Sequence, residues 1–417
     1  MAPTLQHTIQ TEAQQQFASL PRPGAPDEAW RRVPLKSLYP LLELEKGTSQ
    51  LKLGRVRVLA NQRELPALKS GVEEDAQILQ RWQQLEAERQ QHRLERANDV
   101  ELNKLFALPT LYSPLVHVLE ITPESESPIR LDIHLHSDES PAVAAPLYYM
   151  PVLLVHARAH SSASVELHLH ADDQQRRQRS AAMLARSVFI LEEGASIDLY
   201  DARAGAEAPQ LSAGFNLEQA YLGENSVLTI GREIGRFETG MHDARYALQG
   251  RGAKLAEYTL MQAGGERFSG QKTVVEQYGP HTSSEVETRS ILNDRAHGSF
   301  VGTIKIPQGA RGASGNETHR SLLLSPGARI ESLPELEIVE NDVSCSHGST
   351  VTELDAEARH YLESRGISCE ETRKLLTAAF SDQLKARMPG AQPELDALHY
   401  YTEEDVEETA KEDNQSE

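Results

Sequence analysis

Three short stretches decide the fold of this chain: Phe189-Ile-Leu-Glu-Glu-Gly-Ala-Ser-Ile-Asp-Leu199, Ala220-Tyr-Leu-Gly-Glu-Asn-Ser-Val-Leu-Thr-Ile230 and Tyr246-Ala-Leu-Gln-Gly-Arg-Gly-Ala-Lys-Leu255. Each has apolar residues, a turn that contains Gly or Asn, and a second apolar run. Similar stretches follow at 290–300 and 322–330. A recurring unit of strand, tight turn and strand buries its apolar face by stacking on its neighbours. The pattern therefore predicts a solenoid of parallel strands.

The repeats align on a leucine ahead of each turn. The aligned positions, at spacings of 31, 26, 44 and 32 residues, are Leu191, Leu222, Leu248, Leu292 and Leu324. The interval of 44 could hold two turns of 22, with the extra one near Val274 to Val286. Small residues follow the turns, where a chain that bends inward leaves little room: Ala195, Ser226, Ala253 and Ala296. A β-sandwich would also explain strands and turns, but not this recurring register.

Bulk composition excludes several classes of protein. The chain has 417 residues and a formal net charge of -20, which argues against non-specific binding to nucleic acid. The most apolar segment, Pro141 to Val155, contains two further prolines and is too short to span a membrane. We read no secretory signal at the N-terminus. Two cysteines make no disulfide framework, which suits a reducing cytoplasm.

Composition divides the chain into four regions. We expect an N-terminal helical region over 1–110, the strand repeats over 111–350, a C-terminal helical domain over 351–400, and an acidic disordered tail over 401–417. In the first region, Ile78, Trp82 and Leu85 share one face at helical spacing. We interpret this as a solvated helix with a narrow apolar stripe.

A helical hairpin is predicted after the repeats. Asp355 can cap a helix that Gly366 ends. Ser368 and Glu371 then match a capping box at the start of a second helix. That helix carries an apolar face that could pack on the solenoid or bind a partner: Leu375, Leu376, Ala379, Phe380 and Leu384.

The candidate chemistry lies in Cys345-Ser-His347, where a strand pattern gives way to a helical one. Residues i and i+2 of a strand point to the same face, so a thiol and an imidazole could serve one metal or cluster edge jointly. They are two ligands, and a closed site needs about four. From spacing alone, a buried small Cys beside a hydrogen-bonded His is the more common arrangement.

Other candidates are weaker. His134 with His136, and His168 with His170, form His-x-His pairs that could stack into a four-histidine site, but we favour a simple hydrophilic strand face. Cys369 opens a helix and is taken as incidental, and His281, His297 and His319 are assigned no role. We find no phosphate-binding loop that ends in Gly-Lys-Ser/Thr and no zinc-protease or nucleophile-elbow motif, so ATP hydrolysis must belong to a partner.

One segment carries a family resemblance. Leu336-Glu-Ile, Asp342-Val-Ser-Cys-Ser-His-Gly-Ser-Thr-Val351 and Tyr361-Leu-Glu-Ser-Arg-Gly-Ile367 closely resemble the SufB/SufD family, the scaffold subunits of the SUF iron–sulfur cluster assembly machine. Weaker matches lie at 28–38 and 298–306. Within that family the chain looks like SufD, since it lacks a cysteine cluster ahead of the repeats.

The resemblance implies a mainly β fold, a right-handed parallel β-helix flanked by N-terminal and C-terminal helical domains. It implies pairing with a SufB-like paralogue near the C-terminal end of the β-helix, and binding of a SufC-like ABC ATPase through the C-terminal helices. ATP would act through SufC alone. Cys345 and His347 would then take part in a transient iron–sulfur cluster or iron site shared with the partner.

The leading hypothesis is a cytoplasmic scaffold rather than an enzyme. A β-helix enzyme acting on carbohydrate is an alternative, but no repeat position carries recurring acids with Arg or Lys, and such enzymes are usually exported. A SufB-like subunit that holds a complete cluster itself is a second alternative.

Overall fold

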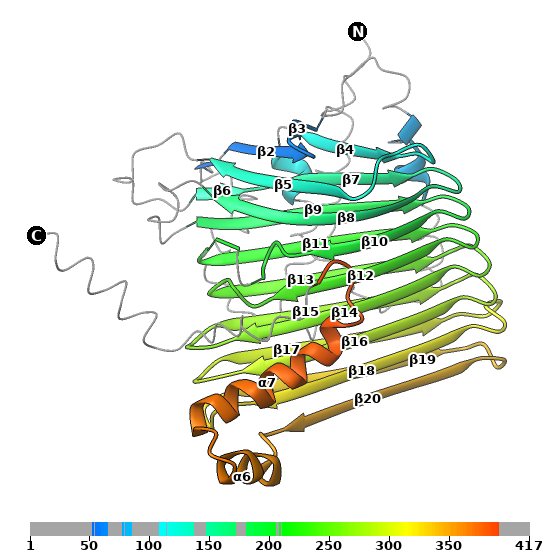
Figure 1. Ribbon diagram of the computed structural model, residues 1–417. Coiled ribbons are helices and arrows are strands. Elements are labelled where there is room, and N and C mark those ends of the chain that lie inside the picture. Colours follow the sequence, from blue (N-terminus) through cyan, green and yellow to red (C-terminus); the bar gives the residue numbers. More distant parts are fainter. Residues whose placement is uncertain are drawn as a thin grey trace, which may run out of the picture.

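Two sheets of mainly parallel strands pack face to face around one core and form most of the protein. The computed structural model describes residues 52–53, 55–65, 77–78, 80–85, 108–113, 115–136, 147–171, 181–205, 208–209 and 211–391. From β7 onward, successive strands alternate between the two sheets, so each coil there consists of one strand from each sheet and the two turns that join them. The result is a parallel β-solenoid of about six turns (Figure 1). This confirms the predicted fold class.

Sheet A contains ten strands: β1 (Lys52–Leu53), β4 (Val116–Ile121), β6 (Leu147–Tyr149), β7 (Val152–Ala157), β9 (Ala181–Leu191), β11 (Ala213–Leu222), β13 (Thr239–Leu248), β15 (Phe268–Gln277), β17 (His297–Ile306) and β19 (Arg329–Ile338).

Sheet B also contains ten: β2 (Arg55–Ala60), β3 (Arg63–Glu64), β5 (Ile129–His136), β8 (Ser162–Ala171), β10 (Ser196–Asp201), β12 (Val227–Ile234), β14 (Lys254–Ala263), β16 (Ser283–Leu292), β18 (Ser314–Leu323) and β20 (Ser344–Thr352).

The register of the coils confirms part of the predicted alignment and corrects the rest. Leu191, Leu222 and Leu248 are direct neighbours in sheet A. Leu292 instead lies in sheet B beside Ala263, and Leu324 follows a sheet B strand. The interval of 44 residues therefore holds one coil and a step to the opposite sheet, not two turns of 22. The alignment slipped because both sheets place a leucine ahead of a turn.

Small residues and positive φ angles shape the corner that leads from sheet A to sheet B. Ala195, Ser226 and Ala253 are fully buried there, as expected. The backbone oxygens of Ala195 and Ser226 accept hydrogen bonds from the next coil. From β7 to β18, each of these corners contains at least one residue with positive φ: His160, Gly194, Asn225, Gly252, His281, and Gly309 with Gly312. Ala296 is equally buried, but it lies at the opposite corner, beside Ala328.

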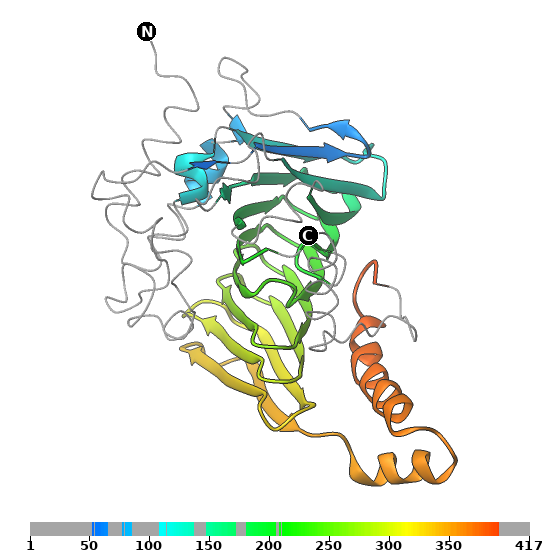
Figure 2. The same cartoon turned by 90° about the vertical axis from the view of Figure 1, so that its left-hand side faces the viewer.

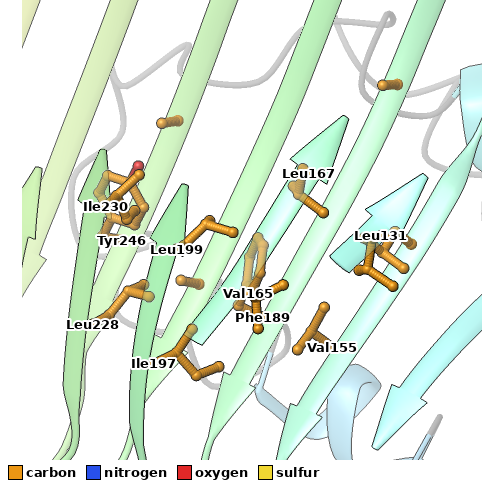
Figure 3. Close-up of a cluster of buried hydrophobic side chains, with 14 of the residues drawn as sticks. Leu131, Val155, Val165, Leu167, Phe189, Ile197, Leu199, Leu228, Ile230 and Tyr246 are labelled. Atoms are coloured by element: carbon orange, nitrogen blue, oxygen red, sulfur yellow. The ribbon is translucent and has the colours of Figure 1, made fainter. Parts of the chain in front are cut away.

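The interior changes character along the solenoid. The first coils are filled with aliphatic and aromatic side chains such as Leu131, Val165 and Phe189, which meet between the sheets (Figure 3). The middle coils instead enclose buried ions. Arg232 bonds to Asp201 at 2.9 Å and to Glu218 at 2.8 Å, and all three side chains are shielded from solvent. Paired charges of this kind avoid the cost of an isolated buried ion.

The N-terminal part differs from the helical region that we expected over 1–110. Residues 52–64 contribute β1, β2 and β3, and β2 pairs antiparallel with β5 at the first coil. The predicted apolar face is present in a short helical stretch, where Ile78, Trp82 and Leu85 pack in one buried cluster with Val152 and Val188. This face is buried against sheet A rather than solvated. α4 (Leu108–Tyr112) lies beside the same sheet.

The predicted C-terminal hairpin is present as α6 (Ala356–Ser364) and α7 (Cys369–Lys385). The Asp355 carboxylate accepts from the backbone N–H groups of Glu357 and Ala358, and the Ser368 hydroxyl accepts from that of Glu371. α7 runs back along the outer face of sheet B, whereas α6 extends beyond the last coil (Figure 2). The predicted acidic tail over 401–417 lies outside the described residues.

Polar bonds fix α7 to the sheet. Arg387 meets the carboxylates of Glu285 at 2.6 Å and Glu287 at 2.5 Å. Arg373 donates to the side chain of Asn293 at 2.7 Å. In the described part of the chain, no helix is long and apolar enough to cross a membrane.

Candidate functional site

The C-terminal end of the solenoid is open. β19 and β20 form the last coil, and each pairs with a single strand in the described structure, β17 and β18 respectively (Figure 1). Nearly all β20 side chains are exposed, Val351 to 51%. An unpaired strand edge is a template for another chain. This end of the molecule is therefore suited to bind a second protein.

Cys345 and His347 lie on β20, and the register shows that both face the space between the sheets. Their in-register neighbours on β18 are Gly315 and Glu317, which point inward. Cys345 is half-buried and packs against the hydrophobic core near Leu336. His347 is exposed. The predicted same-face pairing is thus present at the rim of the open end.

The Cys345 thiol is not activated in the free chain. Burial raises its pKa, and a hydrogen bond with the Gly315 backbone opposes this rise. A metal ligand must be the thiolate, so binding of a cation there has to release a proton. The rim therefore holds one exposed imidazole and one protonated thiol.

Glu317 on β18 is the in-register neighbour of His347, one coil further into the solenoid. The sequence analysis did not single it out. The residue is 1% exposed, and its Oε1 atom has no hydrogen-bond partner in the described structure. Burial, followed by the charges of Glu335 and Glu257, raises its pKa to about 8. Gly302 makes room for this carboxyl group, since a Cβ atom there would lie 2.1 Å from Oε1.

His319, to which the sequence analysis assigned no role, is the second buried titratable residue on this face of β18. It is fully buried two positions beyond Glu317, and its ring packs on Phe300 at a centroid distance of 4.4 Å. Burial lowers its pKa to about 3, so the imidazole is neutral at physiological pH. The alternation of Gly315, Glu317, His319 and Ser321 along β18 was the available signal, because period-2 spacing marks one strand face.

The rim does not form a complete metal site. Among the residues that the structure describes, no three His, Cys, Asp or Glu side chains are grouped to hold a metal ion. Thiolate and imidazole suit iron, but two such groups leave it under-coordinated. The donor set thus fits a cluster edge whose other ligands come from elsewhere.

The two His-x-His pairs lie near the N-terminal end of the solenoid, where their rings stack but do not form a metal site in the described structure. His134 and His170 are in-register neighbours with ring centroids 4.8 Å apart. The outer ring nitrogen of His170 lies 2.7 Å from a carboxylate oxygen of Asp132, and that of His168 lies 3.3 Å from Glu166. The pairs therefore lie on adjacent coils of a polar, half-buried face, as we favoured.

α7 buries only part of its predicted apolar face, Leu384 with Phe380, and several small side chains beside it. Its small side chains, among them Thr377, Ala378 and Ser381, lie against sheet B. Leu384 is fully buried beside Tyr258, so it cannot meet a partner while α7 is docked. Four of the predicted contact residues are exposed or partly buried: Leu375, Leu376, Ala379 and Phe380. Cys369, the first residue of α7, is exposed.

Fold and site together define a class: a parallel β-solenoid whose open last coil carries a thiol and an imidazole. The model of the SUF system FeS cluster assembly SufBD core domain matches residues 142–380. This match covers more than half of the chain, and the chain therefore belongs to the SufBD family of SUF iron–sulfur cluster assembly proteins.

Individual relatives agree with this assignment. The chain is 27% identical over 239 residues to a SufBD family protein of Synechocystis, a match that covers 49% of this chain and 53% of the relative. It is 30% identical over 143 residues to SufD of Escherichia coli, covering 34% of each chain. It is 30% identical over 131 residues to SufD of Bacillus subtilis, covering 31% of this chain and 30% of that protein. The matched segments thus span about half of these relatives or less.

Proposed function

We propose that the chain is a SufD-like, non-enzymatic scaffold that pairs with a SufB-like paralogue and contributes His347, with Cys345, to a nascent iron–sulfur cluster. The observation that carries this proposal is the position of both side chains on the inner face of an open last coil. A sister subunit that pairs with β19 and β20 would bring its own ligands to the same rim. We expect this assembly to work in the reducing cytoplasm, where the thiol remains available.

The site is incomplete by itself, which explains why a partner is needed. Two protein ligands cannot enclose an iron–sulfur cluster, whose irons are typically held by four thiolates or by a mixture of thiolate and imidazole. In this proposal His347 supplies an imidazole nitrogen to the iron, and Cys345 loses its proton as the cluster forms. The cluster is cargo that the pair of subunits builds and releases.

The test is cluster formation on the co-purified complex. His347→Ala should abolish the visible iron–sulfur absorption while assembly of the complex, followed by size-exclusion chromatography, stays intact. His168→Ala is the matched control, because His168 lies on a polar strand face in an early coil. Normal cluster yield from His347→Ala would contradict the proposal.

Anaerobic reconstitution of the isolated chain separates the proposal from a subunit that holds a whole cluster itself. A colourless protein after reconstitution supports a shared site. Strong visible absorption from the isolated chain would favour the self-contained alternative.

We further propose that the α6–α7 hairpin binds a SufC-like ABC ATPase. α6 has no buried residue, and α7 leaves Leu375 37% exposed on the side away from the sheet. Because Arg387 and Leu384 hold α7 in place, these exposed positions can be changed without undocking it. Leu375→Asp should weaken co-purification of the ATPase, whereas Arg329→Asp, at an exposed position on β19, should not. Unchanged ATPase binding by Leu375→Asp would contradict this part.

A further inference from the structure

Five side chains form one continuous line of hydrogen bonds across the interior of the last coils. Ser349 Oγ on β20 donates to Ser332 Oγ on β19 at 2.8 Å, and Ser332 Oγ lies 2.7 Å from His319 Nδ1 on β18. His319 Nε2 lies 2.9 Å from Ser290 Oγ on β16, and Ser290 Oγ donates to Met261 Sδ on β14 at 3.6 Å. The line links the exposed rim to the core three strands away.

The line has one consistent direction. Ser290 gives its proton to the sulfur of Met261, so its oxygen is free to accept from His319 Nε2–H. Ser349 gives its proton to Ser332, so the Ser332 hydroxyl is free to donate to Nδ1. A neutral imidazole has one donor and one acceptor nitrogen, and this tautomer satisfies both. Ser321 Oγ also approaches Nε2, at 3.2 Å.

The bonds matter because the last coil has few other supports. β20 has backbone partners along one side, and no further coil follows it in the described structure. Ser349 lies two residues beyond His347 and faces the same way, since alternate strand residues share a face. A bond to Ser349 thus holds the stretch of β20 that carries the imidazole against sheet A.

We propose that His319 is a positioning residue that, through Ser332 and Ser349, fixes the rim strand β20 and therefore the orientation of Cys345 and His347. This inference rests on the proposed function for its biological meaning. In the free chain, the hydrogen bond at Nδ1 of His319 keeps the last coil closed, and the volume of the imidazole ring does not.

The test compares two amide replacements in the full-length chain by hydrogen–deuterium exchange. The amide of Asn reaches the place of Nδ1 and can still accept from Ser332, whereas the amide of Gln reaches the place of Nε2 and keeps the bond to Ser290 instead. His319→Asn should leave the protection of residues 344–352 close to wild type. His319→Gln should accelerate their exchange about tenfold, the change in opening equilibrium expected for the loss of one hydrogen bond.

Matched variants keep the result interpretable if changes at His319 disturb the core. Ser349→Ala removes the outermost link at an exposed position and should accelerate exchange of 344–352 in the same way as His319→Gln. Thr288→Ala is the control: Thr288 is the in-register neighbour of His319, but its hydroxyl donates to Gln271. It should leave 344–352 unchanged.

A chemical readout gives an independent measure. Alkylation of Cys345, followed by peptide mass spectrometry with Cys369 as the internal reference, should be faster in His319→Gln and Ser349→Ala than in wild type. The inference would be overturned if residues 344–352 and Cys345 were as well protected in His319→Gln as in His319→Asn, or better. That result would show that side-chain volume at position 319, and not the hydrogen bond at Nδ1, controls the last coil. Failure of the proposed function is read separately from cluster yield in His347→Ala, which leaves this line of bonds intact.

Discussion

The first coils and the last coil of the solenoid use the same strand-and-turn unit but finish it differently. At the N-terminal end, β2 closes the stack in antiparallel fashion, and the interior is apolar. At the C-terminal end, β19 and β20 leave their outer edges unpaired in the described structure, and the interior contains Glu317 and His319. The comparison indicates that the early and middle coils are supported by buried contacts on both sides, whereas the last coil has neighbours on one side and should be the less stable end.

The largest expected effect comes from the ion cluster that separates these two ends. Arg232→Met removes one of the two arginines that Asp201 and Glu218 share in a buried site and leaves only Arg203, so it should lower the free energy of unfolding by about 3–5 kcal/mol. Urea denaturation measures this. Arg251→Met, at an exposed turn, is the control and should stay within about 0.5 kcal/mol of wild type. Equal stabilities for both variants would refute the importance of the cluster.

A pair of truncations tests the comparison directly. Leu199→Ala removes a fully buried side chain from the core and should cost about 2–5 kcal/mol. Val351→Ala removes an exposed side chain from the rim and should cost less than about 0.5 kcal/mol. Thermal and urea denaturation of both variants provide the measurement. If Val351→Ala lowered the free energy of unfolding of the free chain as much as Leu199→Ala does, the last coil would be as tightly packed as the early coils.

Glu317 gives a prediction that depends on pH. Its pKa of about 8 in the folded state lies above its ordinary value, so the unfolded chain loses the proton first as pH rises. Wild type should therefore lose stability between about pH 4.5 and pH 8 and level off above that. Glu317→Gln cannot titrate and should not show this loss. The free energy of unfolding of the variant minus that of wild type should therefore be roughly 1–3 kcal/mol larger at pH 8 than at pH 4. A difference that is flat with pH would contradict this account of the buried carboxyl group.

The smallest effect concerns the docked hairpin. Ser368→Ala removes the cap of α7 and should cost about 1 kcal/mol, seen as faster amide exchange in the first turn of that helix. Ser368→Asp keeps an accepting oxygen and should behave as wild type. Fraying in both variants would mean that packing on sheet B, and not the cap, determines where α7 begins.

The sequence predicts those features whose signals are local. Turns with Gly or Asn, the buried Ala195 corner, and the caps at Asp355 and Ser368 each depend on a few neighbouring residues, and the structure contains all of them. Cys345 and His347 share a face because strand alternation requires it. A family resemblance then pointed to the same two residues.

Features that depend on the length of each coil were not predictable in the same way. From the start of β10 to the start of β20, successive sheet B strands are offset by 31, 27, 29, 31 and 30 residues. With such uneven offsets, no fixed period reveals that Arg232 meets Asp201 or that Glu317 lies below His347. The buried face of α7 was predicted only in part, for another reason: close approach to a sheet also selects small side chains such as Ala378 and Ser381, which lie beside the buried Leu384.

The position of α7 has a consequence for how the molecule comes apart. Arg373 ties the helix to Asn293, after β16, and to the backbone oxygen of Leu324, after β18, and Arg387 ties it to Glu285 and Glu287 on β16. In a stack where each coil rests on the one before, unravelling begins at the free end and moves inward. The last coil, β19 and β20, can thus peel away or rearrange while α7, which crosses β14, β16 and the end of β18, keeps the preceding coils in place. The last coil can therefore open while the coils before it stay folded.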